Sequence, residues 1–147
     1  MGVGWTEVIV DLSFEHLDLV VSASRLVCPA TGLDGPGVVG VRDGLIEFIE
    51  MGAGGIEHLT AHESLVVEDG ILLPGLIDLH AHPAVSGSKF GIDADRDLLP
   101  KGSTTVLSQG DAGSRNLDRY IEETIRGSRT RVKLAVNFCA EGASNPE

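Results

Sequence analysis

The chain has 147 residues, which is enough for an ordinary domain with a hydrophobic core. Its 11 Lys and Arg residues against 22 Asp and Glu residues give a net charge of −11, which argues against nucleic acid or an anionic membrane surface as a partner. Two distant cysteines, no basic leader in residues 1–17 and no apolar run of membrane-spanning length predict a cytoplasmic protein without a disulfide framework.

The first half of the chain is predicted to be rich in short strands. Residues 1–17 are expected to be an N-terminal extension, and residues 18–72 a small β domain. Within that domain, "GVVGVRDGLIEFIE" places Asp43-Gly44 between two apolar segments, which predicts a hairpin because this dipeptide tolerates positive φ. Asp69-Gly70 predicts a second turn of this kind. The glycine-rich residues 51–63 are expected to form a loop.

From residue 73 to residue 147 the pattern changes to alternating strands and helices, which predicts an α/β fold with a parallel sheet. The expected strands are residues 71–82, 103–109 and 131–138. A short helix is expected at 93–99, and an amphipathic helix that Asn116 caps and Gly127 ends. A complete (β/α)8 barrel needs about 250 residues. Three parallel strands with one good helix cannot close such a barrel, so the fold looks unfinished.

The first of these strands, "LLPGLIDLHAHP", carries polar side chains on one face. Because side chains two residues apart share a face of a strand, Asp78, His80 and His82 point the same way. Two imidazoles at this spacing can bind one divalent metal, and Pro83 leaves them at the carboxyl end of the strand, where parallel α/β folds place their sites. An isolated HxH is usually surface or core histidine, but the strand context here favours a metal site.

Two aspartates are candidates for supporting roles. Asp78, one layer deeper than the histidines, is expected to orient an imidazole or its neighbours. Asp111 follows the second strand in "SQGDAGSRN" and would line the mouth of the site, although a turn aspartate that caps this segment is the favoured interpretation. Ser88 and Lys89 lie on the first loop after the histidines, and polar loop residues are usually only solvated. His58 and His62 are interpreted as solvated.

The stretch "ILLPGLIDLHAHP" resembles the first barrel strand of the amidohydrolase superfamily of metal-dependent hydrolases. The run "GIDADRDLLPKGSTTVLSQGDAGSRN" followed by "RTRVKLAVNF" is similar to its deacetylase group near dihydroorotase. The resemblance covers roughly residues 18–140. Gln109 in place of a usual acidic residue and Pro100 before "GSTTV" depart from the deacetylase pattern.

The resemblance implies that residues 18–72 are part of a small β-sandwich domain and that residues 73–147 are the first three strands of an incomplete TIM-type (β/α)8 barrel. The complete barrel of the family holds one or two divalent metal ions, usually zinc. His80 and His82 match the two metal ligands of the first strand. The remaining ligands and the catalytic aspartate come from strands beyond Glu147, so no catalytic residue is assigned in this chain. Cys139 is a substitute ligand in principle, although a buried structural cysteine is the preferred interpretation.

Two functions of different classes follow. The complete enzyme would hydrolyse the amide C–N bond of a small molecule such as an N-acyl amino acid through a metal-activated water, with a cyclic amide such as dihydroorotate as the alternative substrate. Alternatively, the chain is a non-catalytic fragment or half-barrel that depends on a partner, because two histidines alone bind a metal weakly. Exposed strand edges and apolar faces would then favour association, including homo-oligomers.

Overall fold

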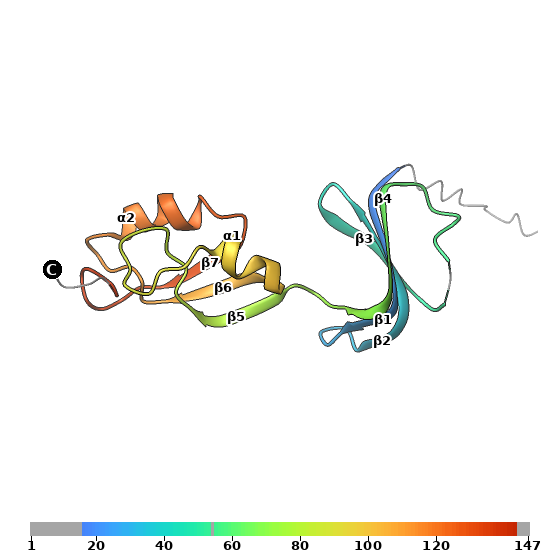
Figure 1. Ribbon diagram of the computed structural model, residues 1–147, viewed down its shortest axis with the longest axis horizontal. Coiled ribbons are helices and arrows are strands. Elements are labelled where there is room, and N and C mark those ends of the chain that lie inside the picture. The colour runs from blue at the N-terminus through green and yellow to red at the C-terminus, as the bar shows by residue number, and fades with distance from the viewer. Residues whose placement is uncertain (1–15, 54, 144–147) are drawn as a thin grey trace, which may run out of the picture. The chain divides into compact units, whose positions relative to one another are not determined.

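A computed structural model describes residues 16–53 and 55–143. The chain divides into two compact units, Met1–Pro74 and Gly75–Glu147, called unit 1 and unit 2 (Figure 1). Most of the predicted N-terminal extension lies outside the described residues, and Leu17, its last residue, is already the first residue of a strand. Among the described residues, no helix is both long enough and apolar enough to cross a membrane.

Unit 1 contains one four-stranded sheet with the order β3-β2-β1-β4. Its strands are β1 (Leu17–Cys28), β2 (Leu33–Arg42), β3 (Leu45–Met51) and β4 (Ala61–Leu72). Strands β1, β2 and β3 pair in antiparallel fashion, whereas β4 runs parallel to β1. The sheet accounts for the predicted strands of this half, while the β-sandwich stays a prediction because the described residues supply a single sheet.

The two Asp-Gly pairs of unit 1 adopt different structures. Asp43 and Gly44 connect β2 to β3 with φ values of 51° and 73°, so the predicted hairpin is confirmed. Asp69 and Gly70 instead lie inside β4, and the predicted turn is wrong. The pairing of β4 with β1 shifts register just there, between Ala23 and Arg25 of β1. The parallel ladder absorbs the dipeptide as an irregularity, because pairing continues on both sides of it.

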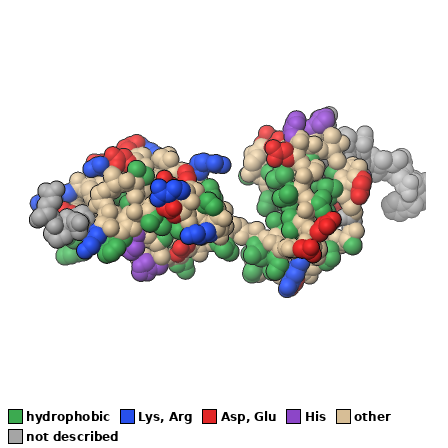
Figure 2. Space-filling view, viewed as in Figure 1, with side chains coloured by type: hydrophobic (Ala, Val, Ile, Leu, Met, Phe, Trp, Pro, Cys, Tyr) green, Lys and Arg blue, Asp and Glu red, His purple; other side chains and the backbone are tan. Residues whose placement is uncertain are grey.

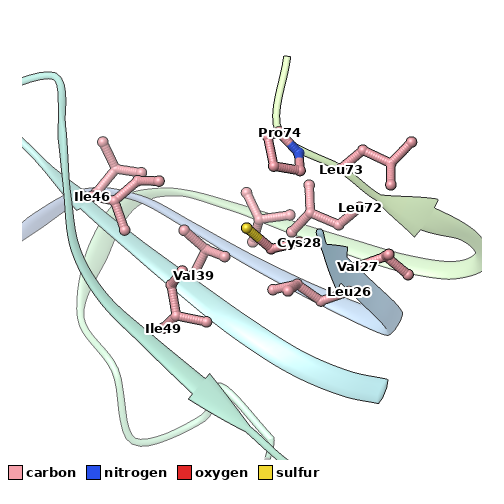
Figure 3. Close-up of a pocket in the computed structure, with 11 residues that line it drawn as sticks. Leu26, Val27, Cys28, Val39, Ile46, Ile49, Leu72, Leu73 and Pro74 are labelled. Atoms are coloured by element: carbon pink, nitrogen blue, oxygen red, sulfur yellow. The ribbon is translucent and has the colours of Figure 1, made fainter. Parts of the chain in front are cut away.

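Unit 1 has a small apolar core and an open apolar groove. Leu17, Val20 and Val38 are buried together, and Phe48, Ile56 and Leu59 are among the partly buried residues packed against them. Figure 3 shows the groove, whose lining comes from all four strands and the segment after β4. Its lining residues include Val21, Leu26, Val39, Ile49, Leu72 and Pro74. The groove holds no charged side chain in its lining, so it offers packing surface rather than chemistry.

Unit 2 contains a three-stranded parallel sheet with the order β5-β6-β7. Its strands are β5 (Leu76–Ala81), β6 (Ser103–Gln109) and β7 (Arg131–Ala135). The second predicted strand is confirmed at both ends. The first was predicted to begin at residue 71, but Ile71 and Leu72 belong to β4 because Pro74-Gly75 interrupts the chain. The third ends before Val136 and Phe138, whose side chains are exposed.

Helices cover one face of this sheet (Figure 1). They are α1 (Ala94–Asp97), the 3-10 turn Leu99–Lys101, α2 (Leu117–Tyr120) and a π-helical turn, Ile121–Ile125, that continues α2. The core between sheet and helices consists of Ala81, Ala84, Ala94, Val106, Ala112, Tyr120 and Val132. Strand–helix alternation over a parallel sheet confirms the α/β class of this half, whereas closure into a barrel stays a prediction.

The amphipathic helix differs from its prediction in two details. Asn116 precedes α2, but its side chain makes no capping bond to the helix and instead accepts from the N–H of Gly113 at 2.8 Å. The second half of the helix is π-helical, since the N–H of Arg126 bonds the carbonyl of Ile121, five residues earlier, at 2.9 Å. This wider turn includes Thr124, which is buried and bonded to the loop after β5.

Candidate metal centre

His80 and His82 lie at the carboxyl end of β5. His80 is the next-to-last residue of the strand and is exposed, and His82 follows its last residue and is partly buried. The two ring centres are 5.5 Å apart and the ring planes meet at 71°. Figure 2 shows histidine side chains reaching the surface of unit 2, so solvent has access to this pair.

This geometry fits two ligands of one metal ion. Two imidazoles on a tetrahedral zinc have ring centres roughly 5 Å apart, because each Zn–N bond is about 2.0–2.1 Å long. The observed 5.5 Å is close to that separation. No group of three or more His, Cys, Asp or Glu side chains is placed to hold a metal within residues 16–53 and 55–143. The described residues thus offer two protein ligands at most, and water would complete the coordination.

Asp111 contacts the ring of His82. Its carboxylate Oδ1 lies 3.1 Å from Nδ1 of His82, and its side chain is fully buried while that of His82 is 29% exposed. Ser88 donates to the same oxygen at 2.6 Å, and Ser108 donates to Oδ2 at 2.5 Å. Asp111 is therefore a buried anchor between β6, the loop after β5 and one histidine, and more than a turn aspartate that caps its own segment.

Asp78 has a different environment from the one expected. Its Oδ1 accepts from the backbone N–H of His80 at 3.0 Å, so it fixes the strand next to the histidine. The imidazole contact expected of Asp78 is made by Asp111 instead. Asp78 stays a candidate for a supporting role through the backbone of His80.

The turn after β6 places Asp111. Gly110 has φ of 83°, a conformation that residues other than glycine rarely adopt, and the chain bends at this residue between Gln109 and Asp111. The segment after β7 packs on this turn, since Asn137 donates from its side chain to the carbonyl of Gly110 at 2.9 Å and from its backbone to that of Ala112 at 2.8 Å. These contacts hold the Asp111 carboxylate from both sides of its loop.

The helical face holds the loop after β5. Tyr120 donates its hydroxyl to the carbonyl of Pro83, and the N–H of Val85 donates to the Thr124 hydroxyl at 3.2 Å. Burial raises the pKa of Tyr120 to about 12, while its hydrogen bond with Ser108 acts in the opposite direction. Tyr120 therefore stays protonated at neutral pH and serves as a fixed donor rather than as an acid or base.

The remaining candidate residues do not contact the ring of His80 or His82. Cys139 is exposed, so the expectation of a buried structural cysteine is wrong, and both cysteines are free. Lys89 lies over the ring of Phe90 at 5.8 Å. His58 and His62 belong to unit 1 and are exposed, as expected, although His62 lies in β4 and stacks on His16 at 6.1 Å.

Two residues that contact Asp111 or His82 were not identified as site residues from the sequence. Ser108 follows Val106 on the buried face of β6, and a polar residue at such a position is a usable signal because it needs a partner. Phe90 lies beside His82, with ring centres 5.6 Å apart. An aromatic residue in a glycine- and serine-rich loop carries no comparable signal.

Comparisons with known proteins find sequence likeness over part of the chain. No family model matches the chain. A deacetylase of Agrobacterium fabrum is 33% identical over 69 residues, which are 47% of this chain and 17% of that protein. A deacetylase of Brucella anthropi is 32% identical over 69 residues, with the same coverage of 47% and 17%. The chain thus spans about a sixth of the length of these curated relatives.

Solved structures extend the likeness to the fold. A dihydroorotase superposes with a TM-score of 0.67 at 23% identity, covering 84% of this chain and 32% of that one. The resemblance to the amidohydrolase superfamily is confirmed. An N-acyl-D-glutamate deacylase from Bordetella bronchiseptica, solved with zinc and a phosphonate inhibitor, superposes with a TM-score of 0.51 at 26% identity over 64% of this chain and 19% of that one. The shared region is partial in each amidohydrolase.

Proposed function

We propose that this chain carries the first-strand half of the metal site of a metal-dependent amide hydrolase, with His80 and His82 as ligands of a divalent ion, zinc in the first instance. The observation that carries the proposal is the pair of imidazoles 5.5 Å apart at the carboxyl end of β5. The deacetylase relatives and the zinc-bound deacylase support the same chemistry.

The substrate class is an N-acylated amino acid or a similar small amide. A divalent metal at this place would activate water for attack on the amide carbonyl. The chain's own residues would bind and orient the ion: His80 from the exposed end of β5, and His82 from a position fixed by Asp111. Sequence likeness favours the deacetylases, because both curated relatives carry that name, whereas the dihydroorotase likeness at 23% identity concerns the fold.

A second proposal is that this chain acts only together with further protein. Within the described residues the site has two histidine ligands, and catalytic zinc sites use three protein ligands. Large apolar side chains on β5 are exposed, among them Leu76, Ile77 and Leu79. Such a surface favours a homo-oligomer or another protein that covers it.

Zinc titration of the purified chain tests the proposed site. Calorimetry on the wild type is expected to show binding that the double variant His80→Ala, His82→Ala abolishes. The matched control is His58→Ala, His62→Ala, which removes two exposed histidines from unit 1 and is expected to leave the isotherm unchanged. Equal zinc binding by both double variants would contradict the assignment of the metal to β5.

A further inference from the structure

Asp111 has more hydrogen-bond partners than a turn residue requires. Its side chain is fully buried, and its two oxygens contact the Ser88 hydroxyl, the Ser108 hydroxyl and the His82 ring. Burying a carboxylate is costly unless donors surround it, so each of these contacts offsets part of that cost. Two of the partners come from segments distant in sequence: Ser88 from the loop after β5, and His82 from the end of β5.

The chemistry of the carboxylate fixes the direction of these bonds. An ionised carboxylate only accepts hydrogen bonds, so every partner must present a hydrogen to it. Both serines meet this condition by rotating their hydroxyls. His82 meets it only when Nδ1, the atom 3.1 Å from Oδ1, carries a proton.

We propose that Asp111, held by Ser88 and Ser108, is a positioning residue that keeps neutral His82 protonated on Nδ1 and so presents the unprotonated Nε2 for a divalent metal. The inference rests on the proposed function for its last step. A neutral imidazole carries one proton, and the nitrogen without it is the one that binds a metal. A carboxylate behind a ligating histidine also fixes the orientation of the ring.

Ser88 and Ser108 hold the Asp111 carboxylate against the ring of His82. Ser88 shares Oδ1 with His82, and Ser108 occupies Oδ2, so the carboxylate has little freedom to rotate away from the ring. Its burial excludes water that would otherwise compete for these oxygens. In the described part of the chain, no carboxylate contacts the ring of His80. The nearby Asp78 accepts from the backbone N–H of His80 instead. The two histidines are therefore expected to differ in tautomer preference.

The direct test is nitrogen NMR of the metal-free chain labelled with 15N in its histidines. At about pH 8.5, under conditions chosen so that the imidazole is neutral, the chemical shifts of the two ring nitrogens report which of them carries the proton. The His82 signals are assigned by their absence in His82→Gln. We expect His82 to be protonated on Nδ1. A ring protonated mainly on Nε2 would overturn the proposal, and this result requires no variant of Asp111.

The isosteric variant Asp111→Asn tests how the carboxylate affects the His82 tautomer and zinc affinity. In Asp111→Asn the side-chain amide can donate to Nδ1, so the population protonated on Nε2 is expected to rise and zinc affinity to fall by about 10–100-fold. Asp118→Asn makes the same chemical change at an exposed position of unit 2 and is expected to alter neither quantity. Wild-type tautomer and zinc affinity in Asp111→Asn would contradict the positioning role.

The two proposals fail in different ways. If His82 is protonated on Nδ1 in the wild type and shifts in Asp111→Asn, the positioning role holds even when zinc leaves the His82 signals unmoved, and only the metal site is then refuted. If zinc shifts Nε2 of His82 equally in the wild type and in Asp111→Asn, the metal site holds and the positioning role is refuted.

Discussion

The two units bury different kinds of side chain. All buried polar residues of the described chain lie in unit 2, namely Ser108, Asp111, Thr124 and Thr130. The core cluster of unit 1 is built from Leu17, Val20 and Val38. A buried polar side chain lowers stability unless it is bonded, so a unit that keeps four of them uses them to hold specific geometry. We infer that unit 1 is a packing module, whereas unit 2 carries the proposed metal site.

The largest effect on stability is expected from the core of unit 1. Leu17 is completely buried, and Leu17→Ala should lower the free energy of unfolding of this unit by about 2–5 kcal/mol through lost burial and the cavity left behind. Urea denaturation followed by the amide NMR signals of each unit measures it. If unit 1 is only a packing module, the His82 ring signals stay unchanged in the variant under native conditions. A changed His82 tautomer would contradict the division of roles.

A smaller effect is expected from the polar cluster of unit 2. Ser108→Ala removes the hydroxyl that donates to Asp111 at 2.5 Å. Because hydrogen bonds to charged groups contribute about 1.5–3 kcal/mol, we expect a loss of that order in the unfolding free energy of unit 2. Ser114→Ala, at an exposed position of the same unit, serves as the control in the same denaturation series. Equal stability of both variants would show that the buried cluster contributes nothing.

The third prediction concerns the loss of stability at acidic pH. Asp95 accepts from the N–H groups of Arg129 and Thr130 and from the Thr130 hydroxyl, and these bonds lower its pKa. A lowered folded-state pKa gives stability that is present above the unfolded value of about 3.9 and is lost as pH falls through the folded value. Asp95→Asn should therefore flatten the acid limb of the denaturation midpoint measured between about pH 6 and pH 2. An unchanged slope would rule out this contribution.

The smallest effect is expected at the surface of unit 1. Arg25 and Asp34 form a two-bond ion pair at 2.8 and 2.9 Å, but their side chains are 53% and 54% exposed. Solvent screens such pairs, so Arg25→Ala is expected to leave the urea midpoint unchanged within error. A large loss would mean that surface electrostatics, not apolar packing, stabilises this sheet.

Local patterns identified several elements correctly. Strand β6 was predicted at both ends because its β-branched residues stand between Gly102 and Gly110, and the Asp43-Gly44 hairpin has a strong local signal. Asp69-Gly70 has the same composition and forms no turn, because β4 continues beside β1 through an irregularity. That outcome depends on a partner strand about 45 residues away, which a local pattern does not contain.

The site was predicted in part for the same reason. The alternation of β5 placed His80 and His82 together, since two residues apart on a strand is a local relation. The role of Asp111 depends on contacts with Ser88 and His82 across the fold, so sequence alone favoured a turn residue. Its burial and its three partners became visible only with the positions of three separate segments.

Zinc K-edge X-ray absorption of the zinc-loaded chain tests the central claim most directly. We expect two imidazole nitrogens at about 2.0–2.1 Å, oxygen atoms in the rest of the shell, and loss of the imidazole scattering in His80→Ala, His82→Ala. Sulfur in the first shell, or imidazole scattering that persists in that double variant, would contradict a metal site built on the end of β5.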